Sequence, residues 1–328
     1  MALISIITPL YNGKKTFSET AESVLSQDFK DWEWILFDDG SKDGTQLEAK
    51  EYSNKYPGKI FYYEHDENAN FGTSFTRNRA IEKSSGEIIG FIDQDDVWYK
   101  NRLTEQYKIL KPLNECAMIW GPSLYWYRDR EYRQPVGYKC QGLQSGIYNP
   151  PDFVEIFLSD IKGTPIPGTT LIRRNYFNKV KGFEESIRGS EDVVLWLKIA
   201  DKFQIYYHDE VLVKYRKHEG STLRIAKESG IMNEWDLGFY KWVSDFLERT
   251  SAKKSIINDN DFTFYSSLKK VSVRKNYLES RIELKKRLDS YPDLKKKFMK
   301  DFILDVILPF EIASKVSAKM RFEWFKKK

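Results

Sequence analysis

The segment Glu87-Ile88-Ile89-Gly90-Phe91-Ile92-Asp93-Gln94-Asp95-Asp96 decides the fold, because an apolar run stops there in three carboxylates within four residues. A short continuous run rich in Ile and Phe is typical of a strand that is buried on both faces, as the strands of a parallel sheet are. The acids therefore lie at the carboxyl end of this strand, which is where open α/β sheets bind ligands.

The three acids also indicate the kind of ligand. Close carboxylates repel one another unless a cation lies between them, and hard oxygen ligands suit Mg²⁺ or Mn²⁺ bound to substrate phosphates. The segment therefore predicts a metal and diphosphate site at Asp93 and Asp95. The alternative is that Asp95 or Asp96 caps the following helix, which would explain one acid and leave the other two unexplained.

The first hundred residues alternate between strand and helix patterns. Strands are expected at residues 3–8, 32–37, 60–64 and 87–92, and helices at residues 16–27, 45–55 and 74–84. This alternation predicts βαβ units and a mostly parallel sheet flanked by helices, an α/β fold. The second strand also ends in two acids, Asp38 and Asp39, so that acidic residues gather at one edge of the sheet.

Length and composition restrict the class of protein. A chain of 328 residues can bury a core large enough to fold without disulfides or structural metals. The two cysteines, Cys116 and Cys140, fit no metal-ligand spacing and form no evident disulfide framework, which favours a reducing compartment. The amino-terminal residues resemble no signal peptide, and no apolar run reaches the length of a membrane span. We therefore expect a cytoplasmic protein.

Three other nucleotide- or phosphate-binding classes can be compared with the spacing. Gly13-Lys14-Lys15-Thr16 resembles the end of a P-loop, but Thr8 stands where the leading glycine belongs, and no Gly-x-Gly-x-x-Gly follows the first strand. Residues 93–97 match the Asp-x-Asp-x-Thr/Val pattern of haloacid-type phosphatases. In those enzymes the pattern ends the first strand, whereas here it ends the fourth, which argues against that class.

Four segments together resemble glycosyltransferase family 2, whose members have the GT-A fold. They are Thr8-Pro9-Leu10-Tyr11-Asn12, residues 38–45, Arg77-Asn78-Arg79-Ala80-Ile81 and residues 93–96. The resemblance covers about residues 3–220 and implies an inverting transferase that uses a nucleoside-diphosphate sugar. The opposed hypotheses are a Mg²⁺-dependent haloacid-type phosphatase and a catalytically silent GT-A-like scaffold protein.

The resemblance also implies a donor site. The residues that it places around the nucleotide are Thr8, Pro9, Tyr11, Asp39, Arg77 and Asp93. A carboxylate at Asp39 can accept a base N–H, and Tyr11 offers a ring for stacking. Asp95 is implied as the ligand of Mn²⁺ or Mg²⁺ on the diphosphate, with Asp93 and His218 as further metal candidates. The donor is expected to be a UDP- or dTDP-sugar, and no nucleic-acid partner is expected.

The second half of the chain carries two more matching segments. Glu191-Asp192 resembles the family's Glu-Asp motif, which implies Asp192 as the general base with Glu191 as the other candidate. Acids are also favoured in the first turn of any helix. Trp196 lies one helical turn from Asp192, where it could face a sugar acceptor or belong to the core. Residues 215–221 resemble a Tyr-Arg-x-His-x-x-Ser segment, in which Arg216 could pair with phosphate oxygens.

Charge is distributed unevenly along the chain. Residues 1–250 hold 33 Lys and Arg against 38 Asp and Glu, whereas residues 251–328 hold 20 against 10. Apolar and aromatic residues alternate with lysines in this tail, which is typical of a helix lying on an anionic membrane surface. A helical bundle packed on the rest of the chain, or on a second copy in a homo-oligomer, is the alternative.

These observations predict two regions. Residues 1–225 are expected to form a GT-A catalytic domain, in which 1–100 bind the nucleotide sugar and 101–225 bind the acceptor, and residues 226–328 a basic helical extension. The expected reaction is inverting transfer of a sugar to a hydroxyl of a glycan or lipid-linked acceptor, in bacterial cell-surface polysaccharide synthesis. The protein would then be cytoplasmic, with peripheral attachment to the inner face of the membrane.

Overall fold

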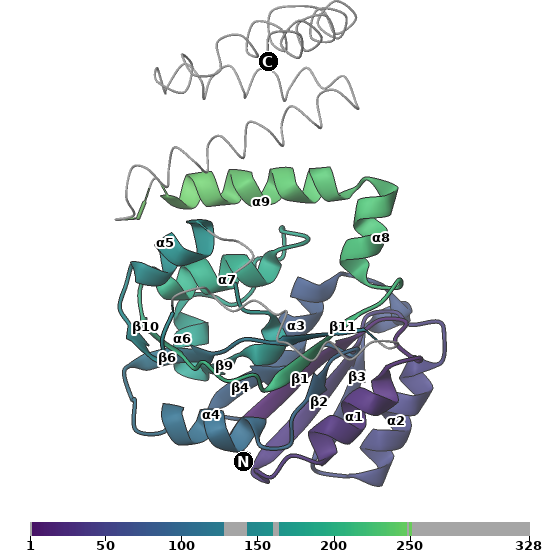
Figure 1. Ribbon diagram of the computed structural model, residues 1–328. Coiled ribbons are helices and arrows are strands. Elements are labelled where there is room, and N and C mark those ends of the chain that lie inside the picture. The colour runs from purple at the N-terminus through teal and green to yellow at the C-terminus, as the bar shows by residue number, and fades with distance from the viewer. Residues whose placement is uncertain (1, 128–142, 160–163, 248, 251–328) are drawn as a thin grey trace, which may run out of the picture. The chain divides into compact units, whose positions relative to one another are not determined.

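The computed structural model describes residues 2–127, 143–159, 164–247 and 249–250. The chain divides into two units, Met1–Ile225 and Ala226–Lys328. In the first unit, helices surround a large mixed sheet (Figure 1). In the second unit the described residues form α9 (Met232–Leu247) and the last turns of α8 (Thr222–Ser229), which crosses the boundary. The rest of the predicted basic extension, residues 251–328, lies outside the described residues, as does Cys140.

The central sheet has eight strands in the order β3-β2-β1-β4-β9-β6-β10-β8. Their bounds are β1 Ile4–Leu10, β2 Trp32–Asp38, β3 Ile60–Glu64, β4 Ile88–Phe91, β6 Cys116–Trp120, β8 Gly146–Tyr148, β9 Leu171–Arg173 and β10 Gln204–Tyr207. The pairs β3·β2, β2·β1, β1·β4 and β6·β10 are parallel, whereas β9 and β8 pair antiparallel to their neighbours. The prediction of an α/β fold with a mostly parallel sheet is therefore confirmed.

The helices of the first half follow the predicted alternation. They are α1 Phe17–Leu25, α2 Thr45–Lys55 and α3 Thr73–Glu82, with α4 Arg102–Leu110, α5 Asp152–Ser159, α6 Arg174–Lys179 and α7 Glu191–Ala200 following later in the chain. Helices α1 and α2 lie side by side, and the rings of Phe17 and Tyr52 meet edge to face there, with centroids 5.8 Å apart (Figure 1). Among the described residues, no helix combines the length and apolar character needed to cross a bilayer.

The strands that carry the acids are buried, as their composition predicts. Every residue of β2 and β4 is buried, and β1 is buried except at Pro9. Strand β1 continues to Leu10, two residues beyond the expected end. Pro9 is tolerated because β4 pairs with β1 only as far as Ile7, so that no strand on that side requires the missing N–H of Pro9.

A small second sheet brings a late segment to the acidic strand end. It contains β5 (Val97–Trp98), which follows Asp96 directly, β11 (Val213–Lys217) and β7 (Leu124–Tyr127). Strand β11 pairs antiparallel with β5 and parallel with β7. The chain therefore returns beside residues 93–96 about 120 residues later.

The amino end of β4 is fixed by a buried polar cluster. Glu33 accepts hydrogen bonds from the Ser5 hydroxyl at 2.7 Å and the Ser85 amide at 2.5 Å, and the Gly86 amide donates to Ser5 Oγ at 2.7 Å. Arg174 donates from Nε to the Gly86 carbonyl. This cluster sets the start of β4 against β1, and through β4 it sets the position of the acidic residues.

Gly86→Ala should therefore destabilise the protein. A Cβ at residue 86 would lie 2.6 Å from the backbone nitrogen of Ser5 and 2.7 Å from its hydroxyl, in a strand that cannot shift. We expect a loss of about 1–3 kcal/mol in the free energy of unfolding, measured by denaturant titration. Gly146→Ala is the control, because a Cβ there meets no heavy atom closer than 4.0 Å. Equal stability of both variants would contradict this assignment.

Candidate functional site

The loop after β1 is clamped onto the acidic loop after β4. Gln94 accepts a hydrogen bond from the Tyr11 amide at 2.9 Å and donates one to the Tyr11 carbonyl at 2.7 Å. A Cβ at Gly13 would lie 2.3 Å from the amide group of Gln94, so a side chain there would displace this amide from its contacts with Tyr11. The Tyr11 side chain is about half exposed, and its ring can therefore meet a ligand. Gln94 was not singled out from the sequence, because its partners are backbone atoms.

Two of the donor-site candidates lie in β1 and not in the loop that follows it. Thr8 is fully buried, and its hydroxyl accepts a hydrogen bond from the Trp34 indole at 2.9 Å. Pro9 is partly buried and pairs in register with Phe37 of β2. Both residues position the strand end from which Tyr11 emerges.

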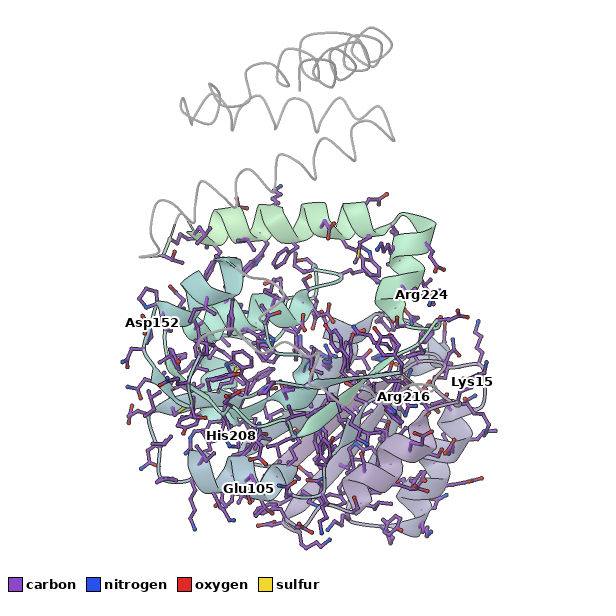
Figure 2. All side chains as sticks on the ribbon, viewed as in Figure 1. Lys15, Glu105, Asp152, His208, Arg216 and Arg224 are labelled. Atoms are coloured by element: carbon purple, nitrogen blue, oxygen red, sulfur yellow. The ribbon has the colours of Figure 1, made fainter. Side chains whose placement is uncertain are left out.

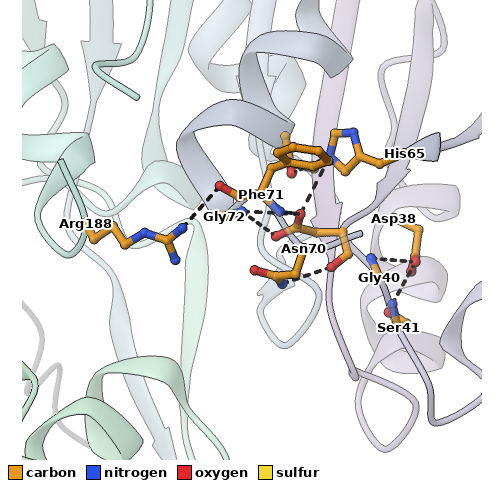
Figure 3. Close-up of polar contacts among 10 residues, drawn as sticks. Asp38, Gly40, Ser41, His65, Asn70, Phe71, Gly72 and Arg188 are labelled. Carbon is orange, nitrogen blue, oxygen red and sulfur yellow. Dashed lines mark hydrogen bonds and ion pairs between the residues drawn. The ribbon is translucent and has the colours of Figure 1, made fainter. Parts of the chain in front are cut away.

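Asp39 directly follows β2 and holds the loop that precedes α3, whose residues Asn70, Phe71 and Gly72 are labelled in Figure 3. Its carboxylate accepts hydrogen bonds from the amides of Phe71 at 2.7 Å and Gly72 at 3.0 Å, and its carbonyl accepts one from Asn70. Burial raises the pKa of Asp39, and the two amides oppose part of that rise. His65 lies 3.6 Å from the same carboxylate. The geometry therefore gives Asp39 a loop-holding contact in addition to any contact with a base.

Each of the three acids after β4 has a different partner. Asp93 accepts from Arg77 Nη2 at 2.6 Å, whereas Asp95 Oδ2 lies 2.8 Å from His218 Nε2. Asp96 is fully buried and accepts from the Arg216 amide at 3.0 Å. Burial raises the pKa of Asp96 well above its ordinary value, and the neighbouring Asp95 and Asp93 carboxylates raise it further.

Arg216 reaches the acidic loop from β11. Its Nε donates to the Asp95 carbonyl at 2.7 Å, its Nη2 lies 2.8 Å from a carboxylate oxygen of Glu19, and its guanidinium stacks 4.0 Å from the ring centre of Trp126. Arg216 is buried within the first unit, whereas Lys15 lies on its surface (Figure 2). The arginine therefore holds the acidic loop, residues 93–96, against β11 and α1. Nothing in the sequence pointed to Glu19, which lies on α1.

Two residues fit a divalent cation at this edge. The Asp95 carboxylate and the His218 imidazole face each other, and both are partly exposed. Asp93, the third metal candidate, is instead engaged with Arg77. Within the described ranges no group of three or more His, Cys, Asp or Glu could hold a metal ion. The donor set fits the manner in which Mg²⁺ and Mn²⁺ bind with substrate phosphates, through one or two protein ligands.

Glu191 and Asp192 begin α7, as the sequence predicts for helix-opening acids. Glu191 lies 3.2 Å from Arg77 Nη1, so Arg77 contacts both Asp93 and Glu191. Burial and the adjacent Glu191 raise the pKa of Asp192 to about 7, although Arg77 opposes the rise. Trp196 is fully buried and donates to the Pro165 carbonyl at 2.9 Å, so it belongs to the core.

The structure joins most of the candidate residues in one region. Arg77 links Asp93 to the start of α7, and the acidic loop links His218 and Arg216 to Tyr11 through Gln94. Arg188, which no pattern had indicated, donates to the Phe71 carbonyl at 3.4 Å and so connects the Asp39 loop with the segment before α7 (Figure 3). An arrangement of carboxylates, one imidazole and ordered loops at a sheet edge can hold a phosphorylated ligand beside a base.

Comparison with known proteins shows the family to which this chain belongs. The model of the family "Glycosyl transferase family 2" matches residues 5–180, more than half of the chain. A relative from Escherichia coli, the UDP-Glc:alpha-D-GlcNAc-diphosphoundecaprenol beta-1,3-glucosyltransferase WfgD, is 36% identical over 254 residues, which cover 76% of this chain and 89% of WfgD. The putative teichuronic acid biosynthesis glycosyltransferase TuaG of Bacillus subtilis is 28% identical over 242 residues, or 73% of this chain and 86% of TuaG.

Solved structures show the same fold. Residues 1–349 of TarS from S. aureus, in complex with UDP-GlcNAc, superpose with a TM-score of 0.60 at 18% identity, covering 89% of this chain and 80% of that one. The mannosyltransferase PcManGT of Pyrobaculum calidifontis, in complex with GDP-Man and Mn²⁺, gives a TM-score of 0.54 at 15% identity, covering 96% and 86%. The predicted resemblance is confirmed: the chain belongs to glycosyl transferase family 2 and has its GT-A fold.

Proposed function

We propose that this protein is an inverting glycosyltransferase that moves a sugar from a nucleoside-diphosphate sugar, either a UDP- or a dTDP-sugar, to a hydroxyl of a glycan or lipid-linked acceptor. One observation carries the proposal: Arg77 contacts both Asp93, in the loop where Asp95 meets His218, and Glu191, the residue before Asp192. The candidate residues for the metal, the donor and the base therefore lie at the same edge of the sheet. WfgD and TuaG, the relatives with named roles, support a place in bacterial cell-surface polysaccharide synthesis. The phosphatase and silent-scaffold hypotheses are not favoured by the family.

The donor would lie along the ends of β1, β2 and β4. The Tyr11 ring can stack on the base, Asp39 holds the loop beside it, and Asp93 faces the ribose. TarS and PcManGT, solved with a sugar nucleotide bound, support this placement by their common fold. Residues 1–100 would then form the donor half and residues 101–225 the acceptor half of the catalytic domain.

Asp192 would act as the general base. It takes the proton of the acceptor hydroxyl, whose oxygen forms a bond to the anomeric carbon while the bond from that carbon to the diphosphate breaks on the opposite face. The nucleoside diphosphate leaves with the bonding electrons. A base with a pKa of about 7 suits this step, because it is strong enough to accept the proton and still ionised near neutral pH. Glu191 is the other candidate for the base.

Transfer should therefore depend on pH through Asp192. The active form is the carboxylate, so kcat should rise with pH through about 7 and level off above it. Asp192→Asn should lower transfer by about 10²-fold or more and remove this rise, with little change in donor affinity. Asp201→Asn, at the far end of the same helix, is the control. A loss confined to donor binding would move the base elsewhere.

A divalent cation, Mn²⁺ or Mg²⁺, is proposed to bind between Asp95, His218 and the donor diphosphate. When bound, it would neutralise charge on the leaving nucleoside diphosphate. The protein's part is to hold these two ligands in place, which the Arg216 bond to the Asp95 carbonyl and the β5·β11 pairing do.

Mn²⁺ affinity tests this assignment. Loss of a group in the outer shell costs about 10- to 100-fold in metal affinity. We therefore expect Asp95→Asn to weaken Mn²⁺ binding in the presence of UDP at least that much, as measured by electron paramagnetic resonance of free Mn²⁺. Asp66→Asn serves as the matched control, since Asp66 is an exposed residue of the loop before α3. Unchanged Mn²⁺ affinity in the Asp95 variant would refute the assignment.

The basic tail is proposed to attach the enzyme to the inner face of the membrane. Residues 251–328 carry a net charge of +10 and include the lysine cluster Lys295, Lys296, Lys297 and Lys300 beside Phe298. Attraction to anionic lipid contributes about 1 kcal/mol of binding free energy per nearby Lys or Arg. Attachment would concentrate the enzyme beside a lipid-linked acceptor. The alternative proposal is that the tail packs in a homo-oligomer, and the experiment below distinguishes the two.

Vesicle binding separates the two proposals. The full chain should co-sediment with vesicles of anionic lipid at low salt and be released as salt is raised. Replacing the four lysines of the cluster by Gln should weaken binding, whereas replacing them by Arg should preserve it. If the protein ignores the vesicles, and light scattering shows that the Gln variant changes oligomeric state, the tail is an assembly element.

A further inference from the structure

Arg77 on α3 is a buried cation shared by two parts of the site. It is 3% exposed, and its two terminal nitrogens reach carboxylates in separate segments. Nη2 lies 2.6 Å from Asp93, which follows β4, and Nη1 lies 3.2 Å from Glu191, which begins α7. The planar guanidinium can contact both at once, which the single ammonium of lysine would not do with the same geometry.

The rest of α3 supports the same connection. The Ser74 hydroxyl donates to the Ile187 carbonyl at 3.4 Å, and Asn78 exchanges two hydrogen bonds of 3.0 Å with the backbone of Phe183. Ser74, one turn before Arg77, and Asn78, the residue after it, therefore also hold the segment that leads into α7. The amino end of α3 follows directly from the loop held by Asp39. Helix α3 thus contacts the donor edge and the segment before α7.

The charges around Asp192 show why the placement of Arg77 matters. Glu191 and Asp93 raise the pKa of Asp192, whereas Arg77 lowers it, and burial of Asp192 makes each effect larger. Arg77 therefore affects the base in two ways: its contact with Glu191 sets where α7 begins, and its charge opposes protonation of Asp192.

We infer that Arg77 is a positioning residue that couples donor binding to the base: by joining Asp93 to Glu191, it fixes the start of α7, and with it Asp192, relative to the donor ribose. The inference rests on the proposed function, since it assumes that Asp93 faces the donor and that Asp192 takes the acceptor proton. A residue that merely lined the donor pocket would need neither the second contact nor the hydrogen bonds on either side of it.

Two variants of Arg77 test the coupling in the full chain. Arg77→Gln removes the charge and the fork, so the midpoint of the pH profile of kcat should move to higher pH and kcat should fall about 10- to 100-fold. Arg77→Lys keeps the charge without the fork, so kcat should fall with a smaller movement of the midpoint. Lys83→Gln is the control and should change neither quantity, because Lys83 is an exposed residue at the end of the same helix and its ammonium lies over the Tyr63 ring.

Glu191→Gln should move the midpoint of the pH profile in the opposite direction to Arg77→Gln. It removes a negative charge beside Asp192, so the midpoint should move to lower pH. It also leaves the arginine buried, which keeps the experiment informative if Arg77→Gln does not fold. If Glu191→Gln abolishes transfer at every pH, Glu191 is itself the base and the inference is overturned. A rise in donor KM alone for the Arg77 variants, with the pH midpoint unmoved, would reduce Arg77 to a donor contact and would also overturn it.

Hydrogen exchange keeps this test separate from that of the proposed function. Arg77→Lys should speed amide exchange in residues 191–195, at the start of α7, whereas Lys83→Gln should not. This result needs no substrate, so it stands even if the wild-type protein transfers no sugar. Unchanged exchange in that turn for the Lys variant would overturn the coupling, whatever donor is found.

Discussion

The structure depends on how three carboxylates at the end of one buried strand are accommodated. Asp93, Asp95 and Asp96 cannot all remain ionised and unpaired so close together. Asp93 pairs with Arg77 from α3, and Asp95 pairs with His218 beyond β11. Asp96 is fully buried, and burial raises its pKa well above the ordinary value. These contacts come from different segments of the chain, namely α3 and β11 with the residue after it. The acidic loop is therefore where these segments meet.

These pairings explain the placement of distant elements. The small sheet has little core of its own, but its pairing β5·β11 delivers Arg216 and His218 to the acidic loop. Arg216 is buried against Trp126 and pairs with Glu19, so it acts as a brace between β11 and α1. Removing one partner of a buried ion pair costs more than the pair contributes, because the remaining charge is left unpaired. Arg216 therefore ties the acidic loop to β11 and to α1.

Further polar contacts connect the end of β2 and α3 with the start of α7. The loop held by Asp39 contacts Arg188, in the segment before α7, through the Phe71 carbonyl. Separately, Arg77 on α3 contacts Glu191, the residue before Asp192. In an inverting transfer the base and the leaving group must lie on opposite faces of the sugar, so small errors in this relation reduce the rate strongly. The contacts of Arg188 and Arg77 hold the start of α7 at two points, which limits such errors if Asp192 is the base.

The sequence by itself determined the strands, the helices between them and the acidic ends, because apolar runs and helical spacing are local signals that the parallel sheet then uses. It also indicated the family, through the order of four short segments. It did not determine the partners of Arg77, Arg216 and Asp39, or that Trp196 belongs to the core. Those outcomes depend on contacts between residues up to about 200 positions apart, such as Arg216 with Glu19. Such contacts leave no periodic pattern in the sequence, because the charges become buried and must be paired only when the chain folds.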